Sequence, residues 1–236
     1  MIRCYMATDI GQMRPNNEDR VQRIEPETYI VADGMGGHAA GEVASAIMID
    51  VANEMLSSVS ESSNVSEMTL KKIILRANER ILATVSEHKE YDGMGTTATM
   101  FHYCDGIGYF AHVGDSRLYY LRDGALKQVT HDHTYVNDLL AKGKITPEEA
   151  ENHPQRNVLM RAVGIEENLI VDTGTFNVRS GDCIMMCSDG LYSVVHDTII
   201  EKILNDSSDN DKAKELVTAA LENESKDNIS AIVIFY

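Results

Sequence analysis

The sequence has little of what would cross-link a fold. It contains four cysteines in 236 residues, and no two of them form a Cys-x-x-Cys pair. Four cysteines are too few for a disulfide framework in a chain of this length, and the missing pair argues against a structural zinc site. We therefore expect free, mostly buried thiols, which suit a reducing, cytoplasmic compartment.

Long apolar runs are also absent. No stretch of 18 apolar residues occurs, so no membrane-spanning helix is predicted. The first residues become polar within ten positions, so we do not expect a signal peptide.

Positive charge is scarce as well, because 21 Lys and Arg stand against 37 Asp and Glu, a formal net charge of −16. Such a chain lacks the cationic surface that binding to nucleic acid or to an anionic membrane requires. With 43% hydrophobic residues it is nevertheless a globular sequence. Its excess carboxylates are what a site for a hard metal ion would be built from.

The apolar pattern predicts helices and strands in separate blocks. One helix is expected to begin near Ala39 and a second shows 3–4 spacing; their apolar faces are Val43, Ala46, Ile47 and Val51, and Leu70, Ile73, Ile74, Ala77, Ile81 and Val85. Strands are predicted at 29–32, 97–103, 107–113, 118–121, 169–178, 183–187 and 229–235, with a hairpin turn at Asp123-Gly124 and helices at 197–204 and 212–221. Because helices do not alternate regularly with strands, we predict an α+β fold in which helices cover packed antiparallel sheets.

A helical insertion is predicted at about 131–164, between strands. A short helix through Val136 and Leu140 should end at Gly143. A second should begin after Thr146, which together with Glu149 has the spacing of a capping box around a proline at the first helical position.

Acidic residues stand at the ends of several predicted strands: Glu18, Asp19, Asp33, Asp115, Asp189 and Asp227. One Asp-Gly pair is ordinary turn chemistry, but strands that repeatedly deliver Asp to an edge can make carboxylates converge. Divalent cations with oxygen ligands would offset their repulsion, and the lack of a Cys/His ligand set favours Mg²⁺ or Mn²⁺ over Zn²⁺. Arg14, four residues before Glu18, is suited to binding a phosphate beside such a site.

These motifs, in this order, resemble the metal-dependent serine/threonine protein phosphatases of the 2C type (the PPM family), in particular bacterial single-domain members. The residues that carry the resemblance are Thr8-Asp9-Ile10-Gly11 with Arg14, Asn17-Glu18-Asp19, Asp33-Gly34-Met35-Gly36-Gly37-His38, Gly95-Thr96-Thr97-Ala98, His112-Val113-Gly114-Asp115-Ser116-Arg117, Thr130-His131-Asp132-His133, His153-Pro154-Gln155-Arg156-Asn157, Arg161-Ala162-Val163-Gly164, Ser188-Asp189-Gly190-Leu191 and Lys226-Asp227-Asn228-Ile229-Ser230. Any one motif is weak, but the ordered set is highly specific and runs from about residue 3 to the last residue.

The resemblance implies one phosphatase domain over residues 1–236. Its fold would be a four-layer α/β/β/α sandwich, two antiparallel sheets flanked by helices, with residues 131–164 as a helical flap beside the cleft. The implied site roles are Asp33 bridging two metal ions with the Gly34 carbonyl on one of them, Asp189 and Asp227 on the second, Glu18 and Asp19 helping to hold the cluster, Asp115 with Asp189 on a third, weaker ion, and Arg14 on the substrate phosphate.

The implied activity is hydrolysis of phosphoserine and phosphothreonine on proteins, opposing a cognate serine/threonine kinase, by a water that two Mn²⁺ or Mg²⁺ ions activate. Two candidates remain for the general acid: His38, and a water held by the cations. Eukaryotic members carry a histidine directly after the Asp-Gly pair, where this sequence has Met35. We expect a cytoplasmic monomer that binds neither nucleic acid nor membrane.

Two other functions fit the same motifs. A pseudophosphatase would bind without turnover, but it would be expected to have lost the bridging Asp or Arg14, and both are present. A metal-dependent hydrolase of small phosphoesters or nucleotides would keep the site and differ in substrate. A calcium-binding structural protein is disfavoured because the spacing of an EF-hand loop is absent.

Overall fold

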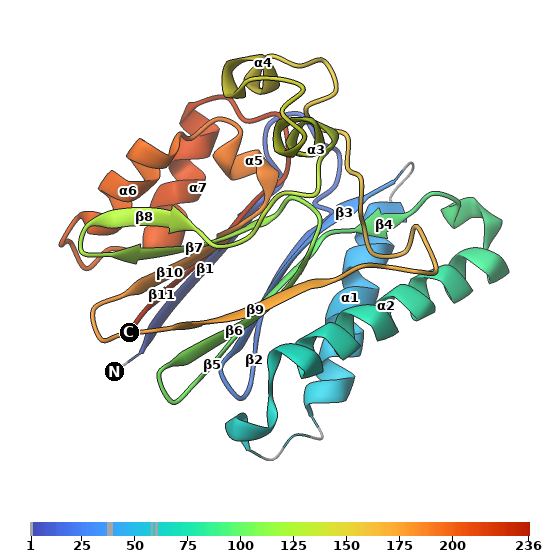
Figure 1. Ribbon diagram of the computed structural model, residues 1–236, viewed down its shortest axis with the longest axis horizontal. Helices are drawn as coiled ribbons and strands as arrows, with labels where there is room; N and C mark the ends of the chain where they lie inside the picture. The colour runs from blue at the N-terminus through green and yellow to red at the C-terminus, as the bar shows by residue number, and fades with distance from the viewer. Residues whose placement is uncertain (1, 37–39, 58, 60) are drawn as a thin grey trace.

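The computed structural model describes residues 2–36, 40–57, 59 and 61–236, and two antiparallel sheets form its centre (Figure 1). The first sheet has the strand order β1-β11-β10-β7-β8, which are Arg3–Asp9, Ile229–Phe235, Cys183–Cys187, Arg117–Arg122 and Ala125–Gln128. The second has the order β2-β3-β5-β6-β9, which are Asp19–Ile24, Thr28–Met35, Ala98–Cys104, Ile107–Val113 and Asp172–Asn177, with β4 (Gly95–Thr96) paired to β3.

The central strands β10 and β11 of the first sheet are apolar on both faces, because each face is covered. In β11, Ile232 and Ile234 pack between the two sheets, whereas Ala231 and Val233 pack under the helices on the other side. Tyr29 and other side chains of the second sheet complete the layer between the sheets. Burial on both sides explains why these strands read as continuous apolar runs and not as alternating ones.

Helices form the two outer layers. The second sheet is covered by α1 (Ala40–Leu56) and α2 (Glu67–Glu87), and the first by α5 (Asp189–Tyr192), α6 (Asp197–Asn205) and α7 (Lys212–Glu222) (Figure 1). The predicted α+β fold with two antiparallel sheets flanked by helices is confirmed. The hairpin turn predicted at Asp123-Gly124 is also present, and both of its residues have positive φ, as such turns require.

The apolar face predicted for α1 is only partly buried. Val51 is buried and Val43 and Ile47 pack half-buried against the core, whereas Ala46 is half-buried outside that cluster. The helix contacts both β3 and α2, so it is apolar on more than one side and its periodicity leaves the face against the sheet undefined. The face that faces inward carries Ala44, Ser45, Met48, Ile49 and Ala52.

The insertion at 131–164 contains α3 (Tyr135–Ala141) and α4 (Pro147–Glu151), as predicted. The Thr146 side chain accepts a hydrogen bond from the Glu149 N–H, and the Glu149 side chain accepts one from the Thr146 N–H, which confirms the capping box. The strand predicted at 169–178 begins only at Asp172. Leu169 is buried in the core cluster beside α2, so its apolar character comes from packing and not from strand structure.

Among the elements without a counterpart in the sequence prediction are β1, the two-residue β4 and the single turn α5. The prediction of free thiols is confirmed, because no cysteine is bonded to another, and Cys183 and Cys187 are buried. Among the helices of the described residues, none combines the length and apolar character needed to cross a bilayer.

Candidate metal centre

Acidic residues from both sheets meet at one end of the sandwich. They surround a cavity of about 350 Å³ whose lining is Arg14, Glu18, Asp33, Gly34, Met35, Gly36, Thr97, Asp115, Asn157, Leu159, Asp189 and Asp227. The second sheet contributes Asp33 on β3 and Asp115 just after β6. The first contributes Asp189 just after β10 and Asp227 just before β11. The convergence expected of carboxylates at strand ends is therefore present.

Asp33 is held by its backbone near the end of β3. Its N–H donates to the Thr97 Oγ1 over 2.9 Å, and its carbonyl accepts from the Thr97 N–H over 2.8 Å and from the Thr96 hydroxyl over 2.9 Å. The pairing of β2 with β3 places Asp19 opposite Asp33. The Asp33 carboxyl is close enough to those of Asp19 and Asp189 for their charges to affect its protonation.

Two glycines allow the backbone to approach closely around this cluster. A Cβ on Gly34 would lie 2.2 Å from the Gly41 carbonyl oxygen, where α1 begins. A Cβ on Gly190 would lie 2.0 Å from the Asn228 carbonyl oxygen. Neither contact leaves room for a side chain, so the glycine after Asp33 and the glycine after Asp189 each fix the distance between two elements that form the site.

Asn228 fastens the loop between β1 and β2 to the first sheet. Its Nδ2 donates to the Ile10 and Asn16 carbonyls, each over 2.9 Å, and its Oδ1 accepts from the Glu18 N–H over 2.8 Å. The same loop carries Arg14, whose Nη2 donates to the Asp227 Oδ2 over 2.7 Å. Arg14 therefore lies at the rim of the cavity beside the acidic cluster, as its sequence position suggested.

The carboxyls in the cluster are protonated more readily than ordinary ones. Burial, followed by the charge of Asp19 and then of Asp189, raises the pKa of Asp33 well above its usual value, and burial with the charge of Asp115 does the same for Asp189. Burial raises the pKa of Asp115 to about 7 and that of Asp19 to about 6. These shifts describe negative charges gathered where water is excluded, with Arg14 and, beside Asp115, Arg117 as nearby cations that offset them only in part.

The donor set fits a hard divalent cation. The acidic side chains that line the cavity and the backbone at Gly34 present oxygen, and among the described residues the lining contains neither cysteine nor histidine. The Asp19 Oδ1 is buried without a hydrogen-bond partner, although Oδ2 accepts from the Ser188 hydroxyl over 2.7 Å. Over the described residues, no three Asp, Glu, His or Cys side chains are already arranged as a ready-made metal-binding group, and Asp227 is paired with Arg14.

Most predicted site residues come together in this cavity. Arg14, Glu18, Asp33, Gly34, Asp115, Asp189 and Asp227 all line it. Asp19 lies behind it, 2% exposed, with its carboxylate against Ser188. His38 lies outside the described residues, so its position is not part of this geometry.

Several residues that shape the site carried no role in the sequence prediction. Thr97 and Asn228 orient the backbone through side-chain hydrogen bonds, and Asn157 and Leu159 close the cavity from the insertion. Thr97, Asn157 and Asn228 all stand within motifs that carry the family resemblance, so motif membership was the available signal. Leu159 carries none, because an ordinary leucine between motifs does not mark a site.

Comparison with known proteins gives consistent results. A family model described as protein phosphatase 2C matches residues 14–232. The serine/threonine phosphatase stp of Listeria monocytogenes is 36% identical over 234 residues, covering 96% of this chain and 93% of that protein. The serine/threonine protein phosphatase PstP of Mycobacterium tuberculosis is 38% identical over 236 residues, which are 99% of this chain and 45% of PstP.

Solved structures agree with this chain in fold as well. Stp1 of Staphylococcus aureus superposes with a TM-score of 0.93 at 34% identity, covering 100% of this chain and 95% of that one. The catalytic domain of PstP in complex with two manganese ions has a TM-score of 0.89 at 35% identity, covering 99% and 97%. The matched model, the sequence relatives and the shared fold show that this chain belongs to the protein phosphatase 2C family of metal-dependent serine/threonine protein phosphatases.

Proposed function

We propose that the acidic cavity holds two divalent cations and that hydrolysis of phosphoserine and phosphothreonine esters takes place there. One observation carries the proposal: carboxylates from both sheets meet in one cavity with Arg14 at its rim. Buried carboxylates whose pKa values are raised by one another are costly to ionise unless cations sit among them. The manganese-bound PstP domain, whose fold is shared, supports the same assignment.

The residues divide by the positions they occupy. Asp33 pairs across the strands with Asp19 and shares the cavity lining with Asp189, which suits a ligand shared by two cations, and the Gly34 carbonyl would add an oxygen. Asp189 and Asp227 would hold the second cation, with Glu18 and Asp19 supporting the cluster. When bound, the two cations supply a water of lowered pKa as the nucleophile and offset charge on the phosphate oxygens.

Arg14 would bind the phosphate group of the substrate. It now donates to Asp227, so substrate and Asp227 are alternative partners for one guanidinium. The planar fork matches phosphate oxygens bidentately and orients the ester for in-line attack. No nucleophilic cysteine or serine is needed, and the buried Cys187 has its thiol pKa raised by burial, which makes it unreactive.

Finer points belong to the same proposal. Mn²⁺ and Mg²⁺ both suit the oxygen donors, and a third, weaker cation would bind at Asp115 with Asp189. The chain would act as one domain with residues 131–164 as its flap, and as a monomer. Free thiols favour the cytoplasm, and its phosphoprotein substrates imply an opposing serine/threonine kinase.

The test is Mn²⁺-dependent release of phosphate from a phosphothreonine peptide, compared with nucleotides and an aryl phosphate. Asp33→Asn should lose the activity, whereas the exposed surface variant Asp92→Asn should keep it. Strong hydrolysis of nucleotides without activity on the peptide would instead favour a small-phosphoester hydrolase. Binding of Mn²⁺ with no turnover of any substrate would favour a pseudophosphatase.

A further inference from the structure

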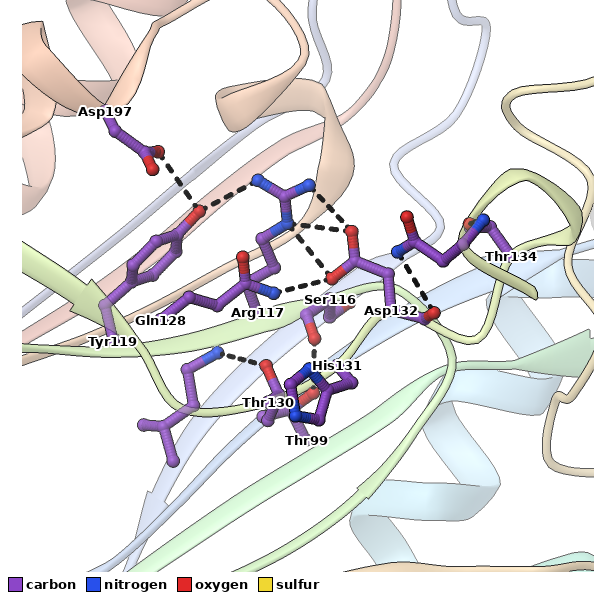
Figure 2. A network of polar contacts seen from close by, with 12 residues as sticks. Thr99, Ser116, Arg117, Tyr119, Gln128, Thr130, His131, Asp132, Thr134 and Asp197 are labelled. Atoms are coloured by element: carbon purple, nitrogen blue, oxygen red, sulfur yellow. Dashed lines mark hydrogen bonds and ion pairs between the residues drawn. The ribbon is translucent and has the colours of Figure 1, made fainter. Parts of the chain in front are cut away.

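The loop between β6 and β7 places Asp115 in the lining of the acidic cavity, and two threonines fix the residue that follows it. The Ser116 carbonyl accepts a hydrogen bond from the Thr99 hydroxyl over 2.9 Å (Figure 2). The Ser116 hydroxyl lies 2.7 Å from the hydroxyl of Thr97, which also holds the Asp33 backbone. One side of Asp115 is therefore anchored to the start of β5 and, through it, to a second acidic residue of the cavity.

A histidine of the insertion at 131–164 fixes the residue before Asp115. The Gly114 N–H donates to the His133 Nδ1 over 3.1 Å, and the Gly114 carbonyl accepts from the His133 N–H over 2.7 Å. The His133 carbonyl in turn accepts from the Met160 N–H over 2.8 Å. His133 thus holds both backbone groups of Gly114 and is itself held by the returning segment of the insertion.

The partners of the His133 ring define which nitrogen carries the proton. Nδ1 can accept from the Gly114 N–H only when it is unprotonated, so the ring is neutral with its proton on Nε2. Nε2 lies 3.2 Å from the Asp172 Oδ2, an acceptor that suits an Nε2–H donor. The side chain is 2% exposed and packs against the His112 ring with the centroids 4.8 Å apart. One tautomer and one ring orientation therefore satisfy both nitrogens.

We propose that His133 is a positioning residue for Asp115: its Nδ1 holds the Gly114 N–H and thereby fixes the backbone from which the Asp115 side chain extends. The proposal rests on the proposed function, in which Asp115 with Asp189 holds the weakest of three cations. A ligand on a loose backbone loses conformational freedom when a cation binds, so fixing it beforehand raises the affinity. Residues that orient metal ligands typically change metal affinity by about 10- to 100-fold when they are replaced.

The test uses two substitutions that each keep half of the imidazole. His133→Asn places an acceptor oxygen near the position of Nδ1, so it keeps the bond to Gly114 and loses the one to Asp172. His133→Gln places a donor near the position of Nε2, so it keeps the bond to Asp172 and loses the one to Gly114. His102→Gln is the matched control, because His102 is also a buried imidazole. It bonds to Thr28 at the start of β3 and lies outside the lining of the cavity.

Free Mn²⁺ is measured by electron paramagnetic resonance across a titration of each protein, and phosphopeptide hydrolysis is measured over the same Mn²⁺ range. Thermal unfolding without metal checks that each variant is folded. In His133→Gln we expect the weakest Mn²⁺-binding step to weaken about tenfold, while the tighter steps stay unchanged. The Mn²⁺ concentration for half-maximal hydrolysis should rise by a similar factor, and excess Mn²⁺ should restore kcat with KM for the peptide unaltered. His133→Asn should recover most of the parent's Mn²⁺ affinity, and His102→Gln should bind Mn²⁺ like the parent.

Two further measurements place the effect on this hydrogen bond. In an Asp115→Ala background, His133→Gln should not change the Mn²⁺ isotherm further, because the ligand that His133 positions is gone. Nitrogen NMR of the metal-free parent at neutral pH should find a neutral His133 with its proton on Nε2. The NMR measurement needs no substitution, so it tests the bond to Gly114 even if His133→Gln does not fold.

The proposal is overturned if His133→Gln binds Mn²⁺ like the parent, if His133→Asn loses as much affinity as His133→Gln, or if the proton is found on Nδ1. It is also overturned if the parent isotherm contains no step that Asp115→Ala removes. Failure of the proposed function has a different signature, namely a parent protein that releases no phosphate from the peptide at any Mn²⁺ concentration.

Discussion

Two buried charged regions lie side by side in this molecule, and they treat charge in opposite ways. In one of them, the Arg117–Asp132 network, Arg117 donates to Asp132 over 2.7 Å and to the Tyr119 hydroxyl over 3.0 Å (Figure 2). Every charge there has a partner at hydrogen-bond distance, and the Asp132 side chain is 5% exposed. In the acidic cavity the carboxyls of Asp33 and Asp189 face other carboxyls, and burial raises their pKa values. The paired region stabilises the fold, whereas the unpaired one requires a ligand that the chain does not supply.

The same distinction holds elsewhere. The Nζ of Lys212, with its side chain 2% exposed, donates to Asp206, Glu215 and Ser208 over 2.8 to 2.9 Å. The buried charges of Lys212 and Asp132 are therefore each neutralised by an oppositely charged side chain at hydrogen-bond distance. A group such as the Asp19 Oδ1, buried with no partner, stands out against that pattern.

We expect the largest effect on activity from a substitution in the acidic cavity. Asp189→Asn removes one of the clustered charges, so Mn²⁺-dependent hydrolysis of a phosphothreonine peptide should fall by more than about a thousandfold. The stability of the metal-free protein should not fall, because repulsion among carboxyls is reduced. Unchanged activity together with unchanged Mn²⁺ affinity would contradict the assignment of Asp189 to the metal site.

A substitution in the Arg117–Asp132 network should instead lower the stability of the metal-free protein. Arg117→Met leaves the Asp132 carboxylate buried without a cation, so the free energy of unfolding should fall by about 3–5 kcal/mol. Adding Asp132→Leu should recover part of that loss, because no charge is then left unpaired. Urea unfolding of both variants without metal measures these changes. If Arg117→Met alone is as stable as the parent, the ion pair does not stabilise the fold.

Metal binding should sharpen the contrast by stabilising only the protein with an intact acidic cavity. Binding to the native state alone raises the free energy of unfolding by about 2.7 kcal/mol at a cation concentration one hundred times Kd. We expect the melting temperature of the parent to rise with Mn²⁺ and to return with a chelator. Asp189→Asn should show a much smaller rise, and an equal rise in both proteins would place the cations elsewhere.

A buried histidine next to the Asp115 loop should make stability depend on pH. Burial lowers the pKa of His112 to about 3, while its Nδ1 and Nε2 lie near the Thr99 hydroxyl and the His131 carbonyl at 2.9 and 3.1 Å. Because the unfolded histidine titrates near 6.5, its contribution is present above that pH and is lost as pH falls toward 3. By pH 5 the loss should be about 2 kcal/mol.

The matched measurement is the difference in unfolding free energy between the parent and His112→Gln, at pH 7.5 and at pH 5. Glutamine does not titrate, so effects of all other groups cancel in the difference. The advantage of the parent over the variant should shrink by about 2 kcal/mol as pH falls. A difference that stays constant would mean that His112 is not held neutral.

Features that depend on local order and spacing could be predicted from the sequence, whereas features that depend on long-range packing could not. Asp33, Asp115 and Asp189 each follow an apolar strand, so their meeting at one end of stacked sheets could be inferred from order and spacing. The face of α1 could not, because a helix that contacts both a sheet and another helix is apolar on several sides. Nor could the contact between Arg117 and Tyr192, which are 75 residues apart in sequence, because no local pattern signals it.

We expect the smallest effect from His38→Ala. This variant tests whether His38 protonates the leaving group or whether a water held by the cations does so. His38 stands five residues after Asp33, whereas Met35 occupies the position next to the Asp-Gly pair. If the cations supply the acid as well as the nucleophile, kcat on a phosphothreonine peptide should fall by less than about tenfold. An aryl phosphate, whose leaving group needs no proton, is the control substrate, and both rates should change alike. A thousandfold loss confined to the peptide would instead identify His38 as the general acid. The protein would then supply the proton for the leaving group, while the cations would offset the negative charge of the carboxylates and the phosphate.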